Sequence, residues 1–117
     1  MENSDGTRRK VALVVEDDRP IGELIAGAIT DELGYLAIYV ENSDAALETT
    51  KRITPDVMVI DFRLPGMSGF ELYDRPQSDP RMRQVPVLFE TATANENIRE
   101  FRRRGIATYV KRSTSGT

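Results

Sequence analysis

The chain has 117 residues, of which 39% are hydrophobic and 30% are charged, and its formal net charge at pH 7 is −3. A chain of this length is expected to form one domain with a single core and no second domain. It contains no histidine and no cysteine, which excludes disulfides, thiol chemistry, Cys/His zinc sites and every histidine-dependent catalytic triad. The chemistry that remains must use carboxylates, hydroxyls and cations.

The charge and hydropathy of the chain also limit its surroundings. It lacks the basic excess of a domain that binds nucleic acid unaided. No apolar run approaches the roughly 20 residues of a membrane span, and Val11 to Val15 is too short for the core of a signal peptide. We therefore expect a cytoplasmic protein that has neither a membrane nor nucleic acid as a direct partner.

Strand patterns recur along the chain. The first, Val11 to Val15, is a continuous apolar run rich in β-branched residues, which is typical of a strand buried on both faces of a parallel sheet. The later strands are predicted at Leu36 to Val40, Pro55 to Phe62, Val85 to Thr91 and Ile106 to Val110.

Helix patterns fill the intervals between these strands. Pro20 suits a first helical turn, and Gly34 is a natural end for the helix that follows it. Its predicted apolar face consists of Ile21, Leu24, Ile25, Ala28 and Ile29. The later helices are predicted from Ser43 or Asp44 to Ile53, from near Gly69 with Ser68 as its cap, and from Glu96 to Arg104. Pro76 should end or kink the helix that begins near Gly69.

Strict alternation of strands and helices predicts the fold class. It implies an α/β domain with a doubly wound, five-stranded parallel sheet, in which right-handed crossovers place helices on both faces. This is a flavodoxin-like architecture. In such sheets ligands bind beyond the carboxyl ends of the strands, where the strand order reverses.

Acidic residues gather at that edge of the predicted sheet. Glu16, Asp17 and Asp18 follow the first strand directly, Asp61 lies at the end of the third, and Thr91 ends the fourth. Several carboxylates at one edge repel one another unless a cation neutralises them, and an all-oxygen cluster suits Mg²⁺ or Mn²⁺. Since Mg²⁺ commonly binds one or two carboxylates together with a phosphate oxygen, the edge has room for a phosphoryl group.

Four segments carry a resemblance to a known family. They are "VALVVEDD", "VMVIDFRLPGMSGFEL", "PVLFETA" and "GIATYVKR". Together they resemble the receiver domain of two-component response regulators, from about Lys10 to Arg112. Residues 1–9 would then be a flexible N-terminal segment, residues 10–112 the receiver domain and residues 113–117 a polar tail.

The resemblance implies a role for individual residues. Asp61 would be the phosphoacceptor, and Glu16 and Asp17 the acid pair, with Asp17 a direct Mg²⁺ ligand. The backbone carbonyl of Arg63 would be a further metal contact. Thr91 would hydrogen-bond the phosphoryl group, and Tyr109 would be the aromatic switch residue of the last strand.

The chain departs from the family pattern near its last strand. A lysine followed by proline is expected three residues after the aromatic, and by spacing Arg112 takes that place, although Lys111 remains an alternative. The last helix of the family is missing, because only Ser113 to Thr117 follow Arg112. A domain swap, a homodimer or a partner would then cover the apolar surface, unless the chain belongs to a longer protein.

Glu90 departs from the pattern within the fourth strand, where an apolar residue is expected. Burying an unpaired carboxylate is costly. A basic neighbour or exposure to solvent would avoid that cost.

The resemblance, together with the acidic edge of the predicted sheet, implies a phosphoacceptor switch that assists its own phosphotransfer and dephosphorylation and is not an enzyme in its own right. A histidine kinase or a histidine phosphotransfer protein would phosphorylate Asp61 in a Mg²⁺-dependent reaction and so change the surface formed by the helix from Glu96 to Arg104 and the last strand. The main alternative is a degenerate receiver that acts as a phosphorylation-independent interaction module. A flavodoxin-like cofactor binder is disfavoured because acids after the first strand would repel a cofactor phosphate, and an aspartyl phosphatase because Arg63 stands where a second Asp is needed.

Overall fold

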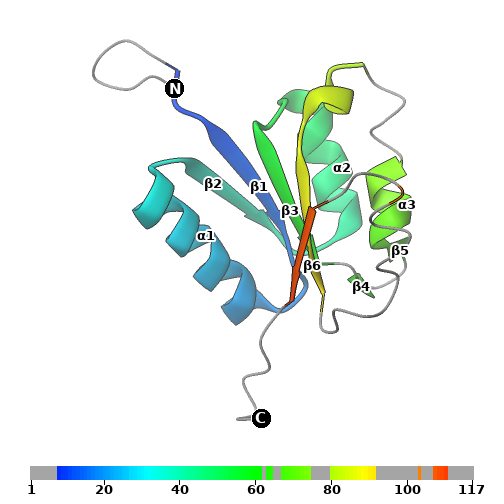
Figure 1. Cartoon of the computed structure of the whole chain (residues 1–117), viewed down its shortest axis with the longest axis horizontal. Helices are drawn as coiled ribbons and strands as arrows, with labels where there is room; N and C mark the ends of the chain where they lie inside the picture. The colour runs from blue at the N-terminus through cyan, green and yellow to red at the C-terminus, as the bar shows by residue number, and fades with distance from the viewer. Residues whose placement is uncertain are drawn as a thin grey trace.

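The computed structural model describes residues 8–61, 63–64, 67–74, 80–91, 103 and 107–110. Figure 1 shows a sheet with α1 (Arg19–Leu33) on one face and α2 (Ser43–Arg52) and α3 (Gly69–Asp74) on the other. The sheet order is β2 (Leu36–Val40), β1 (Val11–Val15), β3 (Val57–Asp61), β6 (Val87–Thr91) and β7 (Ala107–Val110). All the strand pairs in this sheet are parallel. The predicted α/β class with a five-stranded parallel sheet is therefore confirmed.

Strand β1 lies in the interior of the sheet, and its predicted bounds are confirmed. It pairs with β2 on one side and with β3 on the other. The side chains from Ala12 to Val15 have no exposed surface, as expected for a strand covered on both faces. Full burial of a side chain such as Leu13 contributes roughly 1.5–3 kcal/mol to folding. The core cluster around β1 also includes Met58, Ile60 and Phe89 from the strands and Ala46 and Leu72 from the helices.

Helix α1 begins and ends where the sequence predicts. Asp18 is its N-cap, and the Asp18 carboxylate Oδ1 accepts from the Ile21 N–H at 3.2 Å. Pro20 lies in the first turn. At the other end Gly34 adopts φ 70°, the left-handed conformation that a residue without Cβ reaches at no steric cost.

The predicted apolar face of α1 is wrong at Leu24 and Ala28. Leu24 is 72% exposed and Ala28 is also exposed, whereas Ile25 is half-buried. Gly22 is the buried residue of this helix, since α1 packs on β1 and β2 and presents its Gly22 side to them. The periodicity thus predicted the helix but not the width of the face that the sheet covers.

The starts of three other elements differ from the predicted ones. Asn42 caps α2 in place of Ser43 or Asp44, because it has the extended backbone and its Oδ1 accepts from the Ala45 N–H at 2.8 Å. Strand β3 starts after Pro55, which has no N–H for a ladder. Strand β6 starts after Pro86, preceded by the 3-10 turn η2 (Met82–Gln84).

The segment "LPGMSG", predicted as a turn, includes the end of β4 (Arg63–Leu64) and the whole of β5 (Met67–Ser68), and these two short strands form an antiparallel pair. The predicted helix from Glu96 to Arg104 falls outside the described residues except for Arg103, which is helical. Pro76 and the tail after Val110 also lie outside them. Among the described helices, none combines the length and the hydropathy that a membrane crossing requires.

Candidate metal and phosphoacceptor site

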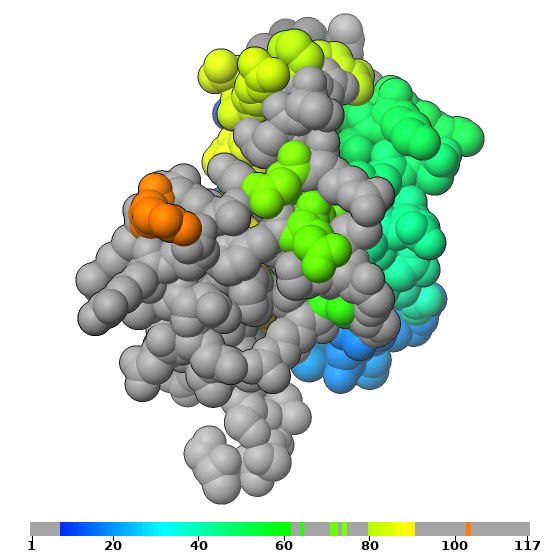
Figure 2. Space-filling model, turned by 90° about the vertical axis from the view of Figure 1, so that its right-hand side faces the viewer, coloured from blue at the N-terminus to red at the C-terminus, as the bar shows by residue number. Residues whose placement is uncertain are grey.

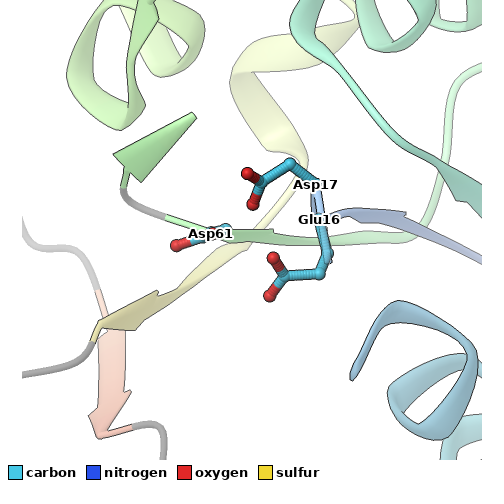
Figure 3. A group of neighbouring side chains, drawn as sticks. All are labelled: Glu16, Asp17 and Asp61. Atoms are coloured by element: carbon cyan, nitrogen blue, oxygen red, sulfur yellow. The ribbon is translucent and has the colours of Figure 1, made fainter. Parts of the chain in front are cut away.

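Three of the predicted site residues meet at the carboxyl ends of β1 and β3. Glu16 and Asp17 follow β1, and Asp61 is the last residue of β3. One carboxylate oxygen from each residue can be chosen so that all three lie within 4.8 Å of one another. Figure 3 shows the three carboxylate groups pointing to the same side of the strand ends. Oxygen donors with this spacing and charge fit a hard divalent cation such as Mg²⁺.

Glu16 is the buried member of the cluster, with no exposed surface. Burial is the main reason that the pKa of its carboxyl is raised from 4.5 to about 8, and hydrogen bonding and charge from Asp61 add to the rise. The Asp18 N–H donates to Glu16 Oε2 at 3.1 Å and opposes this rise. Without a cation, Glu16 therefore holds a proton at neutral pH.

This raised pKa predicts how the stability of the metal-free protein depends on pH. The unfolded chain releases the Glu16 proton near pH 4.5, whereas the folded protein keeps it to about pH 8. The stabilisation from this group is complete below about pH 4.5 and is lost as the pH rises toward about 8. Thermal unfolding in the presence of a chelator should thus show a lower melting temperature at about pH 8 than at about pH 6.

Glu16→Gln is the matched control for this pH dependence, because it keeps the shape of the side chain and cannot ionise. Its melting temperature should change less between the two pH values than that of the wild type. An equal or larger fall in the variant would show that Glu16 is not the group that titrates.

The adjacent acids Asp17 and Asp18 are both exposed but have different roles in the structure. Asp17 belongs to the three-carboxylate cluster. Asp18 directs its carboxylate to the first turn of α1 as the N-cap. The three consecutive acids of the sequence are thereby divided between the cluster and the helix.

The structure gives the backbone positions of the other predicted site residues that it describes. Arg63 begins β4, Thr91 ends β6, and Tyr109 lies in β7. Because β6 pairs with β3 in register, with Glu90 opposite Asp61, the end of β6 lies beside the end of β3 that carries Asp61. Lys111 and Arg112 lie outside the described residues.

Glu90 is buried in the sheet next to the site. It is 1% exposed, so the predicted alternative of solvent exposure is wrong. Its register partners are Asp61 in β3 and Tyr109 in β7. The buried acid therefore lies in the strand next to Asp61, at the same level of the sheet.

A residue that the sequence did not indicate also contacts the site. The Tyr39 hydroxyl, from β2, donates to the Glu16 backbone carbonyl oxygen at 2.7 Å. Nothing in the sequence distinguishes Tyr39 from other strand residues. The one sequence signal is Gly22, because a glycine inside a helical pattern indicates that another group packs closely against the helix, and here that group is the Tyr39 ring.

A cavity of about 460 Å³ opens at the opposite edge of the sheet and is unrelated to the cluster. Its lining includes Arg8, Asp56, Arg81 and Gln84, which lie near the amino ends of β1, β3 and β6. Figure 2 shows the yellow segment around η2 at the far end of the molecule from the blue segment that follows β1. None of the predicted site residues lines this cavity.

Comparison with known proteins agrees with this geometry. Residues 12–115 match the family model of the response regulator receiver domain, and the chain belongs to that family. It is 32% identical over 108 residues to hybrid signal transduction histidine kinase D of Dictyostelium discoideum, covering 92% of this chain and 7% of that protein. It is 35% identical over 88 residues to the phosphate regulon transcriptional regulatory protein PhoB of Pseudomonas aeruginosa, covering 75% of this chain and 38% of that protein.

A solved structure of a receiver domain is also similar to this chain. The receiver domain of the sensor histidine kinase PA1611 from Pseudomonas aeruginosa superposes with a TM-score of 0.75 at 26% identity, covering 92% of this chain and 88% of that one. That structure has a magnesium ion coordinated in its active site cleft. The chain thus spans less than half the length of both curated relatives and nearly all of an isolated receiver domain.

Proposed function

We propose that this receiver domain is a phosphoacceptor switch of a two-component phosphorelay in the cytoplasm, and that Asp61 is the residue phosphorylated. The observation that supports this most strongly is the convergence of Glu16, Asp17 and Asp61 within 4.8 Å at the carboxyl edge of the sheet. Two of the three acids are buried, and acids crowded in this way destabilise a fold unless a cation neutralises them, so such clusters are typical of functional sites.

The residues present fit a bound Mg²⁺. The carboxylates of Glu16, Asp17 and Asp61 and the backbone carbonyl of Arg63 would hold it, and the magnesium ion in the PA1611 receiver domain supports this choice. When bound, the ion supplies positive charge that offsets the carboxylates and the phosphoryl oxygens. Mn²⁺ satisfies the same oxygen donors.

The phosphotransfer step requires little covalent chemistry from the domain. An Asp61 carboxylate oxygen attacks phosphorus and forms an O–P bond while the donor's bond to phosphorus breaks. The bonding electron pair leaves with the donor group, which is the imidazole nitrogen of a phosphohistidine. Since this domain has no histidine, the proposed donor lies outside it, in a sensor histidine kinase or a histidine phosphotransfer protein. The domain assists its own phosphorylation and dephosphorylation and is not an enzyme with a separate substrate.

Phosphorylation would act on the surface beside β6 and β7. The phosphoryl group adds roughly −1.5 to −2 charges and three acceptor oxygens at the end of β3. Thr91 is proposed to bind it, Tyr109 to change orientation, and Arg112, or Lys111 in its place, to supply the cation. Such a local charge can bias an element that has two arrangements, here the segment from Glu96 to Arg104 and strand β7.

The second candidate is a degenerate receiver that binds a partner without being phosphorylated. The departure from the family pattern after Tyr109 favours it, because Arg112, or Lys111 in its place, stands where the family has a lysine followed by proline, and a guanidinium does not replace an ammonium directly. The acids of the cluster favour the phosphoacceptor, since an interaction module has no need for them.

Phosphoryl uptake from a small donor distinguishes the two candidates. Incubation with acetyl phosphate and Mg²⁺ should add one phosphoryl group to the intact mass of the wild-type protein. The same incubation with a chelator, or with Asp61→Asn, should add none. No gain in the wild type with Mg²⁺ bound, either with acetyl phosphate or with a panel of phosphorylated histidine phosphotransfer proteins, would support the interaction module.

A further inference from the structure

The peptide unit that joins Glu16 and Asp17 is held by the neighbouring strand β2. The Tyr39 hydroxyl donates to the carbonyl oxygen of this peptide unit at 2.7 Å. The Glu16 N–H donates to the Val40 carbonyl at 3.1 Å. Both backbone groups of Glu16 are therefore bound by β2, one through the ladder and one through a side chain.

The Tyr39 ring is itself fixed by helix α1. A Cβ placed on Gly22 would lie 2.1 Å from Tyr39 Cε1, so the ring occupies the space that any other residue at position 22 would need. The Arg19 guanidinium carbon lies 5.7 Å from the ring centroid. Arg19 also pairs with Glu23 at 3.4 Å and with Glu41. The hydroxyl thus reaches the loop after β1 from a ring that has little freedom to move.

We infer that Tyr39 is a positioning residue for the metal site, because its hydroxyl fixes the peptide between the two carboxylates that would bind the cation. The inference rests on the proposed function, in which Glu16 and Asp17 are metal ligands. Binding of the ion needs both acids charged and side by side, an arrangement in which they repel one another and favour an open loop. The hydrogen bond from Tyr39 to the peptide between them holds the loop closed. The loop is then already ordered before the ion binds, so binding costs less conformational entropy.

Tyr39→Phe tests the inference, because it removes the hydroxyl and keeps the ring packed against Gly22. Calorimetric titration with Mg²⁺ alone should give a dissociation constant about three- to tenfold higher than that of the wild type, the equivalent of one hydrogen bond. Tyr35→Phe is the matched control, because among the described residues no hydrogen bond uses the Tyr35 hydroxyl. The hydrogen bond that Tyr35 accepts from Arg9 goes to its backbone carbonyl, which the substitution keeps. This control should bind Mg²⁺ as the wild type does.

The outcomes separate this inference from the proposed function. If the wild type binds Mg²⁺ and Tyr39→Phe binds it within twofold as well, the inference is wrong and the metal site remains. If Tyr35→Phe weakens binding equally, the effect does not come from the contact with Glu16, and the inference is also wrong. If the wild type does not bind Mg²⁺, both proposals fail. A melting temperature of the metal-free variant that falls while its Mg²⁺ affinity stays unchanged would show a purely structural role and would overturn the positioning role.

Discussion

Replacing Asp17 by asparagine should remove most of the Mg²⁺ affinity of this domain, whereas the same replacement at Asp18 should leave it nearly intact. Asp17 lies in the three-carboxylate cluster, but Asp18 caps α1 through the bond to the Ile21 N–H. For Asp17→Asn we expect at least the 10- to 100-fold loss that is typical even of groups that only support a metal ligand. Asparagine at position 18 keeps a side-chain oxygen for the cap.

The comparison is sharp because the two residues are adjacent, exposed and equally charged. A purely electrostatic attraction of Mg²⁺ to the acidic loop would weaken to a similar extent in both variants. Equal Mg²⁺ affinities in the two variants, measured by calorimetric titration at the same ionic strength, would contradict a specific site and indicate diffuse counterion binding.

Replacing Gly22 by alanine should destabilise the domain even though alanine is the better helix former. The added Cβ would meet Tyr39 Cε1 at 2.1 Å and Cζ at 2.5 Å, and such overpacking typically costs about 1–3 kcal/mol. The gain in helix propensity is at most about 1 kcal/mol. We therefore expect a net fall in the free energy of unfolding, together with weaker Mg²⁺ binding because the Tyr39 ring is displaced.

Gly27→Ala in the same helix is the control. Apart from its chain neighbours and the backbone of its own helix, no atom lies within 4 Å of a Cβ placed at this exposed position. The substitution should therefore raise the free energy of unfolding by roughly 0.5–1 kcal/mol. Denaturant unfolding of both variants gives the two changes directly. A Gly22→Ala variant as stable as Gly27→Ala would show that Tyr39 does not occupy the position described.

The sequence predicts those parts of the fold that depend on local pattern. Strand β1 has its predicted bounds because its continuous apolar run is buried on both faces of the sheet. Helix α1 has its predicted ends because Pro20 and Gly34 each satisfy a specific backbone requirement. The predicted N-cap of α2 is wrong because Asn42, Ser43 and Asp44 are all good capping residues, and only the backbone angles of the folded chain select Asn42.

The exposure of Leu24 was not predictable in the same way, since periodicity identifies an apolar stripe but not what covers it. The amount of sheet and helix surface that packs over α1 determines that exposure.

The candidate site was predictable as a set of acids at one edge, because the carboxyl ends of parallel strands must meet there. What the sequence could not give was the state of each acid. Glu16 becomes a buried carboxyl with a raised pKa through its surroundings, and Asp18 becomes a cap. Tyr39 enters the site through a contact between β2 and the loop after β1, which no sequence spacing encodes.

The location of the phosphoryl group decides whether Asp61 is the phosphoacceptor. After incubation with acetyl phosphate and Mg²⁺, borohydride reduction converts an aspartyl phosphate into homoserine, which tandem mass spectrometry of peptides can place in the sequence. We predict conversion at Asp61 and at no other acid. Homoserine at Asp17, reduction of Glu16 to 5-hydroxynorvaline, or no reduced residue anywhere after the intact protein has gained a phosphoryl group would contradict the proposed function.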